Sequence, residues 1–441
     1  MSYNVPNDLL AMLQSGALPS EIKVVSKSPA GGTGSGEAEN GTWANPYRTI
    51  GAAVAAMTPV DGADQSTWAE QLWIMSGEYD EDVEFTKSKI MLIYTVGAVR
   101  IGTPLVPQSV TWNKDAPTQI TGAPPGTFVP AIMMLLPMPQ VADSEITLFE
   151  INGDFIVTGD PETRFCWFQN TNVQDRIMGE DTGQPTEWTG SFDMALVQSK
   201  AETVQFGLTV TYEWTFQKSA VGAGIFVGGN ELAGGSIVFD NASVDSGSFT
   251  PNGLPMETAA VWAPEANEMI ALTGSEFDGD VEARVVAFRD SQFGVGSTVT
   301  VRDSDLQDCV FGGGFISTND ADKMRRCEFV GNVDVADITL IEDCIFQANF
   351  ENDTGNPDVR GCLFEGGTDF GSVGMVSNCR FNDTLDATSA EAYFLGCRVT
   401  GAINFTDPTK FYVDIASNSM THIAGSAFPA TTNLLNDTTI P

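Results

Sequence analysis

The sequence predicts an all-β fold: a right-handed, single-stranded parallel β-helix, or solenoid, with an N-terminal capping helix. Three observations predict it. Cysteines recur every 17 or 18 residues, phenylalanines recur in phase with them, and a Gly-rich opening precedes an alanine-rich segment. Fixed self-similarity over a short period is typical of solenoids, in which each repeat stacks on its neighbours.

The cysteine repeat defines the rungs between residues 309 and 397, with spacings of 18, 17, 18, 17 and 18 residues. An apolar residue, usually phenylalanine, follows each cysteine by two positions. Residues two apart on a strand share a face, so both members of each pair are expected to point into the core. The predicted core ladder consists of Cys309, Cys327, Cys344, Cys362, Cys379, Cys397, Phe311, Phe329, Phe346, Phe364 and Phe381.

A corner is predicted just before each cysteine, because the preceding apolar residue lies three positions away and has the wrong parity for one continuous strand. Most residues at this corner tolerate left-handed or turn conformations. They are Gly274, Asp290, Asp308, Arg326, Asp343, Gly361, Asn378 and Gly396, with Ser275 and Ser291 replacing cysteine upstream and a weaker copy at Ala242. The segment 168–173 is a further expected corner.

The 17/18 alternation departs from the strict hexapeptide period of left-handed β-helices, which favours the right-handed form. Stacked cysteines also suggest disulfides or zinc. In-register side chains point in parallel rather than at each other, and zinc usually needs four converging ligands. Core packing of compact thiols is therefore the favoured interpretation.

The N-terminal region supplies a second group of motifs. Residues 40–50 have the sequence NGTWANPYRTI, an alanine-rich helix is expected to begin near Thr49, and residues 72–85 contain Gly77, Tyr79 and Glu81 in a G-x-Y-x-E pattern. These motifs resemble the opening of pectin-lyase-like β-helix proteins, including viral spike and tailspike types. The resemblance implies a helix that covers the open end of the first rung.

Five segments are expected along the chain. They are 1–22, an N-terminal attachment segment with a short helix at 9–13; 23–102, the cap and first rungs; 103–260, irregular rungs with loop insertions; 261–400, regular rungs of 17–18 residues; and 401–441, C-terminal rungs and a tail.

The net charge of −37 predicts a surface that repels nucleic acid and anionic membranes. No apolar run reaches the ~18 residues expected of a membrane-spanning helix, and no secretory signal pattern is visible at the N-terminus. Production in a host cytoplasm and residence on a virion surface are therefore expected, with the N-terminal segment bound to other virion proteins. Viral spikes that this chain resembles are commonly homotrimers.

Candidate catalytic groups are few. The hydrolase and pectinesterase motifs of this fold are missing beyond the G-x-Y-x-E pattern, and the lone histidine, His422, is more simply structural. If the chain is an enzyme, Asp303, Asp305 and Asp308 are the carboxylates expected to act on a glycosidic bond. Arg284, Arg289 and Arg302 lie near them in the sequence.

Acidic clusters raise the question of calcium. Asp278, Asp280 and Glu282 form one cluster, and Asp320 and Asp322 form another. Carboxylate oxygens at such spacings can hold Ca²⁺. A solvated acidic face is the simpler interpretation in so acidic a chain, so no cofactor is expected.

Three functions remain open from the sequence. The first is a virion structural protein, such as a spike, head fibre or tailspike-like decoration that faces host-surface glycans. The second is a polysaccharide lyase or hydrolase. The third is a non-catalytic carbohydrate-binding adhesin, for which Trp112, Trp188 and Trp214 are the expected sugar-stacking residues. Fold analogy alone does not choose between them.

Overall fold

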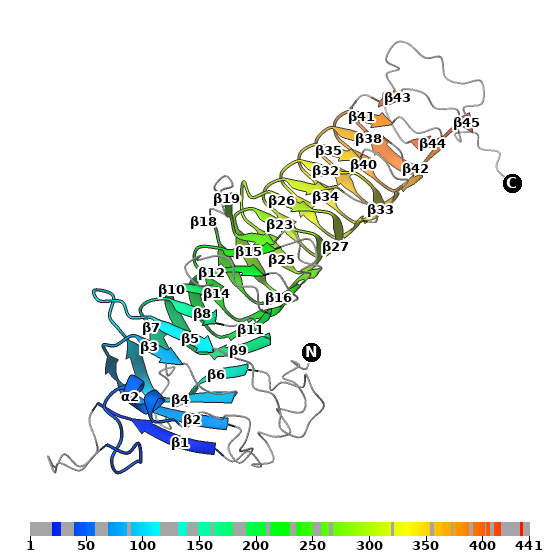
Figure 1. Cartoon of the computed structure of the whole chain (residues 1–441). Coiled ribbons are helices and arrows are strands. Elements are labelled where there is room, and N and C mark those ends of the chain that lie inside the picture. Colours follow the sequence, from blue (N-terminus) through cyan, green and yellow to red (C-terminus); the bar gives the residue numbers. More distant parts are fainter. Residues whose placement is uncertain are drawn as a thin grey trace, which may run out of the picture. The chain divides into compact units, whose positions relative to one another are not determined.

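The fold is described from a computed structural model of the chain. The described residues are 20–27, 39–57, 69–85, 90–114, 131–138, 149–159, 163–179, 191–208, 212–229, 235–249, 257–263, 268–318, 322–352, 357–371, 374–387, 391–401, 403–405, 410–415 and 433–434. The chain divides into two compact units, which meet in sequence near Gly222 and Ala223. Parallel strands build both units, as the repeat predicts (Figure 1).

The first unit is a stack of parallel strands arranged on three faces. Its strands are β1 (Ser20–Val25), β2 (Ala69–Tyr79), β3 (Val83–Phe85), β4 (Ile90–Ile101), β5 (Val110–Lys114), β6 (Ala131–Met138), β7 (Phe149–Ile151), β8 (Phe155–Gly159), β9 (Thr163–Gln169), β10 (Thr171–Gly179), β11 (Ser191–Val197), β12 (Lys200–Leu208), β13 (Glu213–Gln217) and β14 (Ala220–Val221). One face follows the order β1-β2-β4-β6-β9-β11-β13. β15 (Ile225–Gly229) lies at the division between the units.

The only helix among the described residues, α2 (Ile50–Ala55), covers the start of this stack, as expected. Thr49 is its N-cap, and the Thr49 hydroxyl accepts the Ala52 N–H at 3.1 Å. Glu81 accepts the N–H groups of Ile50 at 2.7 Å and Gly51 at 3.0 Å. The glutamate of the G-x-Y-x-E pattern therefore satisfies the free amides at the helix N-terminus and ties the helix to the first rung.

The second unit repeats three short strands per rung, and each strand pairs in parallel with its equivalent in the next rung. The first face contains β16 (Ser236–Asp240), β21 (Glu268–Leu272), β24 (Val285–Arg289), β27 (Asp303–Gln307), β30 (Asp322–Arg325), β33 (Ile338–Glu342), β36 (Asp358–Arg360), β39 (Met375–Ser377), β42 (Glu391–Val399), β44 (Lys410–Ile415) and β45 (Asn433–Leu434). The second contains β17 (Ser243–Asp245), β22 (Ser275–Asp278), β25 (Ser291–Phe293), β28 (Val310–Phe311), β31 (Glu328–Phe329), β34 (Ile345–Phe346), β37 (Leu363–Phe364) and β40 (Arg380–Phe381).

The third face of this unit contains β20 (Val261–Ala263), β23 (Val281–Ala283), β26 (Val299–Val301), β29 (Phe315–Ser317), β32 (Val333–Val335), β35 (Phe350–Asn352), β38 (Thr368–Phe370), β41 (Leu385–Ala387) and β43 (Ile403–Phe405). β18 (Gly247–Phe249) and β19 (Glu257–Ala259) form a separate antiparallel pair. Ring-wise repetition of parallel strands confirms the predicted parallel β-helix.

The predicted core ladder is confirmed. Every one of its cysteine and phenylalanine side chains is buried. From Phe293 to Phe381, successive rings lie 4.6 to 5.0 Å apart between centroids, with planes within 6° of parallel. Offset aromatic stacking adds to the free energy of burial. This continuous stack fixes the rung register of the second unit.

The predicted corners are also confirmed. All eight corner residues have a positive φ, from +48° at Asp290 to +69° at Gly274. Arg326, the one residue there without turn preference, adopts φ +51° with the others. The segment 168–173 turns at Asn170, where φ is +45°.

At the corners before Cys327, Cys344 and Cys362, one backbone amide lacks a backbone partner, and the ladder cysteine of the next rung supplies an acceptor. The Cys327, Cys344 and Cys362 N–H groups donate to the Sγ atoms of the following rungs at 3.4 to 3.5 Å. The accepting thiols of Cys344, Cys362 and Cys379 also lie within hydrogen-bond distance of a backbone carbonyl. A small side chain with a polar atom is therefore favoured here, because a buried unpaired amide is costly, although Ala242 also occupies this buried position.

Candidate functional site

The carboxylates named from the sequence lie around β27. Its residues alternate, so Asp303 and Asp305 face outward while Ser304 and Leu306 face the core. Asp308 follows at the corner and is exposed. The strand therefore presents Asp303 and Asp305 on one outer face and Asp308 beyond the turn.

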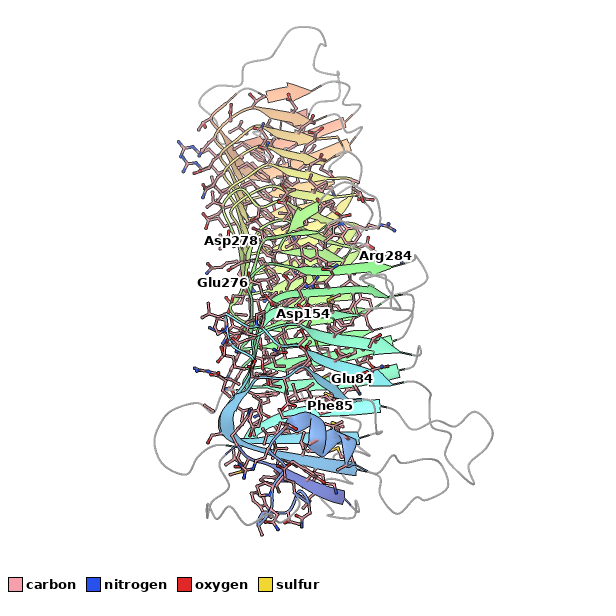
Figure 2. The ribbon with its side chains drawn as sticks, turned by 60° about the vertical axis from the view of Figure 1, so that its left-hand side comes forward. Glu84, Phe85, Asp154, Glu276, Asp278 and Arg284 are labelled. Atoms are coloured by element: carbon pink, nitrogen blue, oxygen red, sulfur yellow. The ribbon has the colours of Figure 1, made fainter. Side chains whose placement is uncertain are left out.

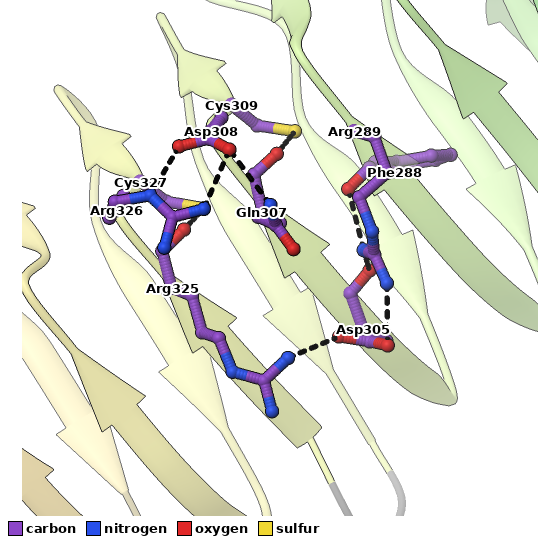
Figure 3. Close-up of polar contacts among 9 residues, drawn as sticks. All are labelled: Phe288, Arg289, Asp305, Gln307, Asp308, Cys309, Arg325, Arg326 and Cys327. Carbon is purple, nitrogen blue, oxygen red and sulfur yellow. Dashed lines mark hydrogen bonds and ion pairs between the residues drawn. The ribbon is translucent and has the colours of Figure 1, made fainter.

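Asp305 lies between two arginines of neighbouring rungs (Figure 3). The Arg289 Nη2 atom donates to Asp305 Oδ2 at 2.6 Å, and Arg289 Nη1 donates to the Asp305 carbonyl at 2.5 Å. The Arg325 Nη1 atom is 3.7 Å from Asp305 Oδ1. Two guanidinium groups thus neutralise this carboxylate.

Asp308 has a partner of its own. The Arg326 Nε and Nη2 atoms donate to its two carboxylate oxygens at 2.7 and 2.8 Å, and Gln307 adds a bond at 2.9 Å. These hydrogen bonds, with the Arg326 bond the strongest, lower the pKa of Asp308 to about 2. Bidentate pairing of this kind stabilises the ionised form.

This arrangement supports ion pairing better than glycosidic chemistry. A general acid needs a carboxyl whose pKa is raised, so that it carries a proton at working pH. Asp308 has the opposite shift. Arginine does not give up its proton in proteins, so Arg289, Arg325 and Arg326 serve here as fixed cations.

The second acidic group is dispersed by the fold. Asp278 lies at the end of β22 and Glu282 in β23, and Asp280 between them accepts the Thr298 N–H of the next rung at 2.6 Å. Figure 2 shows Asp278 and Glu276 at one side of the second unit and Arg284 at the other. Asp278, Asp280 and Glu282 therefore lie on two different strands and the turn between them.

The acidic clusters are also candidate ligands for a metal ion. Among the described residues, no group of three or more histidine, cysteine, aspartate or glutamate side chains is placed to hold a metal ion. Asp320 and His422 lie outside the described residues. The expectation of no cofactor, with Ca²⁺ as the alternative, stays a prediction.

The tryptophans expected to stack on sugars are placed differently. Trp112 and Trp214 are each only 1% exposed, so the expectation of a sugar-binding surface at these residues is wrong. Both occupy inward positions of their strands, and the Trp214 Nε1 atom donates to the Phe192 carbonyl at 2.7 Å. Burial of a large ring in the core outweighs surface display. Trp188 lies outside the described residues.

The thiols are shielded from any ligand and hydrogen-bond to one another. Against the effect of burial, bonds with Cys327 and Cys362 lower the pKa of Cys344, and bonds with Cys362 and Cys397 lower the pKa of Cys379. All seven cysteines are free and buried. Burial raises the pKa of Cys166 well above its usual range, and hydrogen bonding with Cys327 together with burial does the same for Cys309. Reactive cysteines need a lowered pKa and exposure. The cysteine ladder therefore acts in packing.

The sequence did not reveal that the first unit has a polar ladder of its own. Thr171, Ser199 and Ser219 take the ladder position there, each after a residue with positive φ. The Ser199 hydroxyl accepts the Thr171 N–H at 3.1 Å, and the Ser219 hydroxyl accepts the Ser199 N–H at 3.2 Å. Irregular rung lengths hide the repeat, although a small hydroxyl residue after each turn is its signal.

The sequence also did not reveal an aromatic cluster at the N-terminal cap. Trp43, from the loop after β1, contacts Trp73 of β2, which stacks on Tyr94 of β4. These residues come from three separate segments, so only the parallel pairing of β2 with β4 brings them together.

Comparisons with known proteins add no relative. No protein-family model, curated protein or solved structure matches this chain. The resemblance to pectin-lyase-like proteins therefore stays a prediction made from its cap and first-rung motifs. Among the described residues, no helix has the length and apolar character needed to cross a bilayer.

Proposed function

We propose that this chain is a structural protein of a virion surface, a spike, head fibre or tailspike-like decoration, and not a free enzyme. The observation that carries the proposal is the register of the second unit, where rings from Phe293 to Phe381 stack within 6° of parallel. Unbroken stacking of this kind makes a stiff support, because a packed interior resists deformation.

The state of the carboxylates points the same way. Asp305 and Asp308, the two groups best placed for chemistry, are held in ion pairs with arginines of adjacent rungs. Cross-rung pairs of this geometry tie neighbouring repeats together on the outside, as the phenylalanine ladder does on the inside. Ion pairs that tie neighbouring rungs together are consistent with a structural role.

The proposed role on a virion surface also implies binding partners. We assign attachment to other virion proteins to the N-terminal segment 1–22 and a host-surface glycan to the exposed part of the chain. Assembly as a homotrimer belongs to the proposal too. The net charge of −37 disfavours nucleic acid as a partner.

Two measurements test the proposal. Immunogold labelling of intact particles, with antibodies raised against the purified chain, is expected to place it on the particle surface. Label confined to soluble material would contradict the proposal.

The second measurement is incubation with neutral and acidic polysaccharides, with product length read by mass spectrometry. Chains of unchanged length are expected. Shortening that is lost in Asp305→Asn or Asp308→Asn but kept in a Glu276→Gln control would establish a depolymerase instead.

A further inference from the structure

The N-terminal cap presents an exposed tryptophan on a tightly held loop. Trp43 is 59% exposed. The Asn40 Oδ1 atom accepts the Thr42 N–H at 3.1 Å and the Thr42 hydroxyl at 2.7 Å, and Asn45 N–H donates to that hydroxyl at 3.2 Å. The Gly41 carbonyl accepts the Val24 N–H at 2.8 Å, which ties the loop to β1. The loop thus fixes where this indole points.

A second indole completes a corner with the first. The rings of Trp43 and Trp73 lie 5.5 Å apart between centroids at an angle of 64°. The Trp73 Nε1 atom donates to Gln71 Oε1 at 3.2 Å, and Trp73 stacks on Tyr94 at 4.7 Å, with planes 25° apart. Both the loop and the sheet therefore hold the corner in place before any ligand arrives.

Steeply angled aromatic rings suit a compact cation. The face of an indole carries negative potential, and two faces at a steep angle can contact one tetrahedral ammonium together. A flat sugar ring would instead require one open, unobstructed ring face. The angle of 64° favours the compact group.

The charge of the chain favours a cation as well. A net charge of −37 raises the local concentration of cations and repels anions. Arg48, a basic residue of the same loop region, pairs with Glu39 at 3.9 Å. Lys23 lies on β1 next to this loop and makes contacts of its own.

We propose that the corner formed by Trp43 and Trp73 is a binding site for a quaternary or methylated ammonium group. The ligand class is a small organic cation free in solution. The site lies in the cap and does not depend on the proposed virion role.

The test compares a cation with its neutral isostere. Choline and 3,3-dimethyl-1-butanol have the same shape and differ in charge. Tryptophan fluorescence and calorimetric titration of the full chain are expected to detect choline binding, at least 10-fold weaker binding of the alcohol, and weaker choline binding in high salt.

Variants locate the effect. Trp43→Ala is expected to reduce choline affinity at least 10-fold without changing the unfolding midpoint, because this side chain is exposed. Trp262→Phe, in the second unit, is the matched control and is expected to bind normally. Equal binding of alcohol and choline, unchanged binding in Trp43→Ala, or no choline binding at millimolar concentration would each overturn the proposal.

Discussion

Phe329 and Phe346 lie on successive rungs with ring planes 1° apart and centroids 5.0 Å apart. Their strands, β31 and β34, pair in register, so the backbone pairing and the ring stacking impose the same spacing. Agreement between the two interactions makes each rung depend on its neighbours, which is the basis of cooperativity in repeat proteins.

Phe346→Ala is expected to destabilise the chain by about 3–5 kcal/mol, because it removes a buried ring and leaves a cavity within the stack. Ile345→Ser changes the adjacent residue, which is 37% exposed, and is expected to cost much less. Denaturant unfolding followed by circular dichroism measures both. Similar costs for the two variants would show that the ladder carries no special share of stability.

Replacement of Cys344 tests the role of its sulfur as an acceptor. Cys344→Ser keeps an acceptor for the Cys327 N–H, as Ser199 and Ser219 do in the first unit. Cys344→Val keeps the bulk and loses the acceptor, which leaves a buried amide unpaired at a cost of about 1–3 kcal/mol. Valine is therefore expected to be the more destabilising change in thermal unfolding. A valine variant as stable as the serine variant would contradict the assigned role.

The raised pKa of Asp193 is expected to make the stability of the protein depend on pH. Burial, with a smaller repulsion from Glu213, raises this pKa from 3.8 to about 6, against the lowering effect of the Glu213 N–H bond. The folded state therefore binds this proton more tightly than the unfolded state. The stabilisation is complete below pH 3.8 and is lost as pH rises through about 6.

Asp193→Asn is expected to stabilise the protein at pH 7 by at most about 3 kcal/mol. The amide keeps an oxygen for the Glu213 N–H, which donates at 2.8 Å. Unfolding measured from pH 4 to 8 is expected to show the gain only at the higher pH values. A constant difference across that range would rule out titration of Asp193 as its origin.

Glu81 is expected to stabilise the N-terminus of α2 through its hydrogen bonds. Glu81→Ala removes the acceptor for the Ile50 and Gly51 amides and is expected to cost about 1–2 kcal/mol. Glu78→Ala, an exposed neighbour on β2, is the matched control and is expected to be neutral. Hydrogen exchange at α2 measures the local effect. Unchanged exchange in Glu81→Ala would mean that Thr49 alone caps the helix.

Substitutions of Asp308 test the contribution of its exposed ion pair with Arg326. The Asp308 pKa of about 2 means that the pair with Arg326 is complete above pH 3.8 and is lost as pH falls through about 2. Asp308→Asn removes the charge but tolerates the positive φ, so a small loss is expected. Asp308→Val also strains the corner and is expected to cost more in thermal unfolding. Equal losses would show that backbone conformation at this corner is unimportant.

Much of the second unit was predictable because its chemistry is local and repeated. The spacing of Cys309 to Cys397 predicts the rung length, and the parity break predicts the left-handed corner that Asp308 and Arg326 adopt. These features depend only on strand periodicity and turn preference, which act over a few residues.

Other features depend on which distant residues the fold brings together. The sequence contains Asp305, Arg289 and Arg325, but only rung stacking makes them partners. The sequence shows Trp112 and Trp214 in irregular segments, and only the alternation of their strands determines that both face the core.

By itself, then, the sequence determined the period, the corners and the core ladder, because these follow from short-range geometry. The tertiary structure decided the ion pairs, the burial of Trp112 and Trp214 and the aromatic corner at Trp43, because these depend on contacts between residues far apart in the chain.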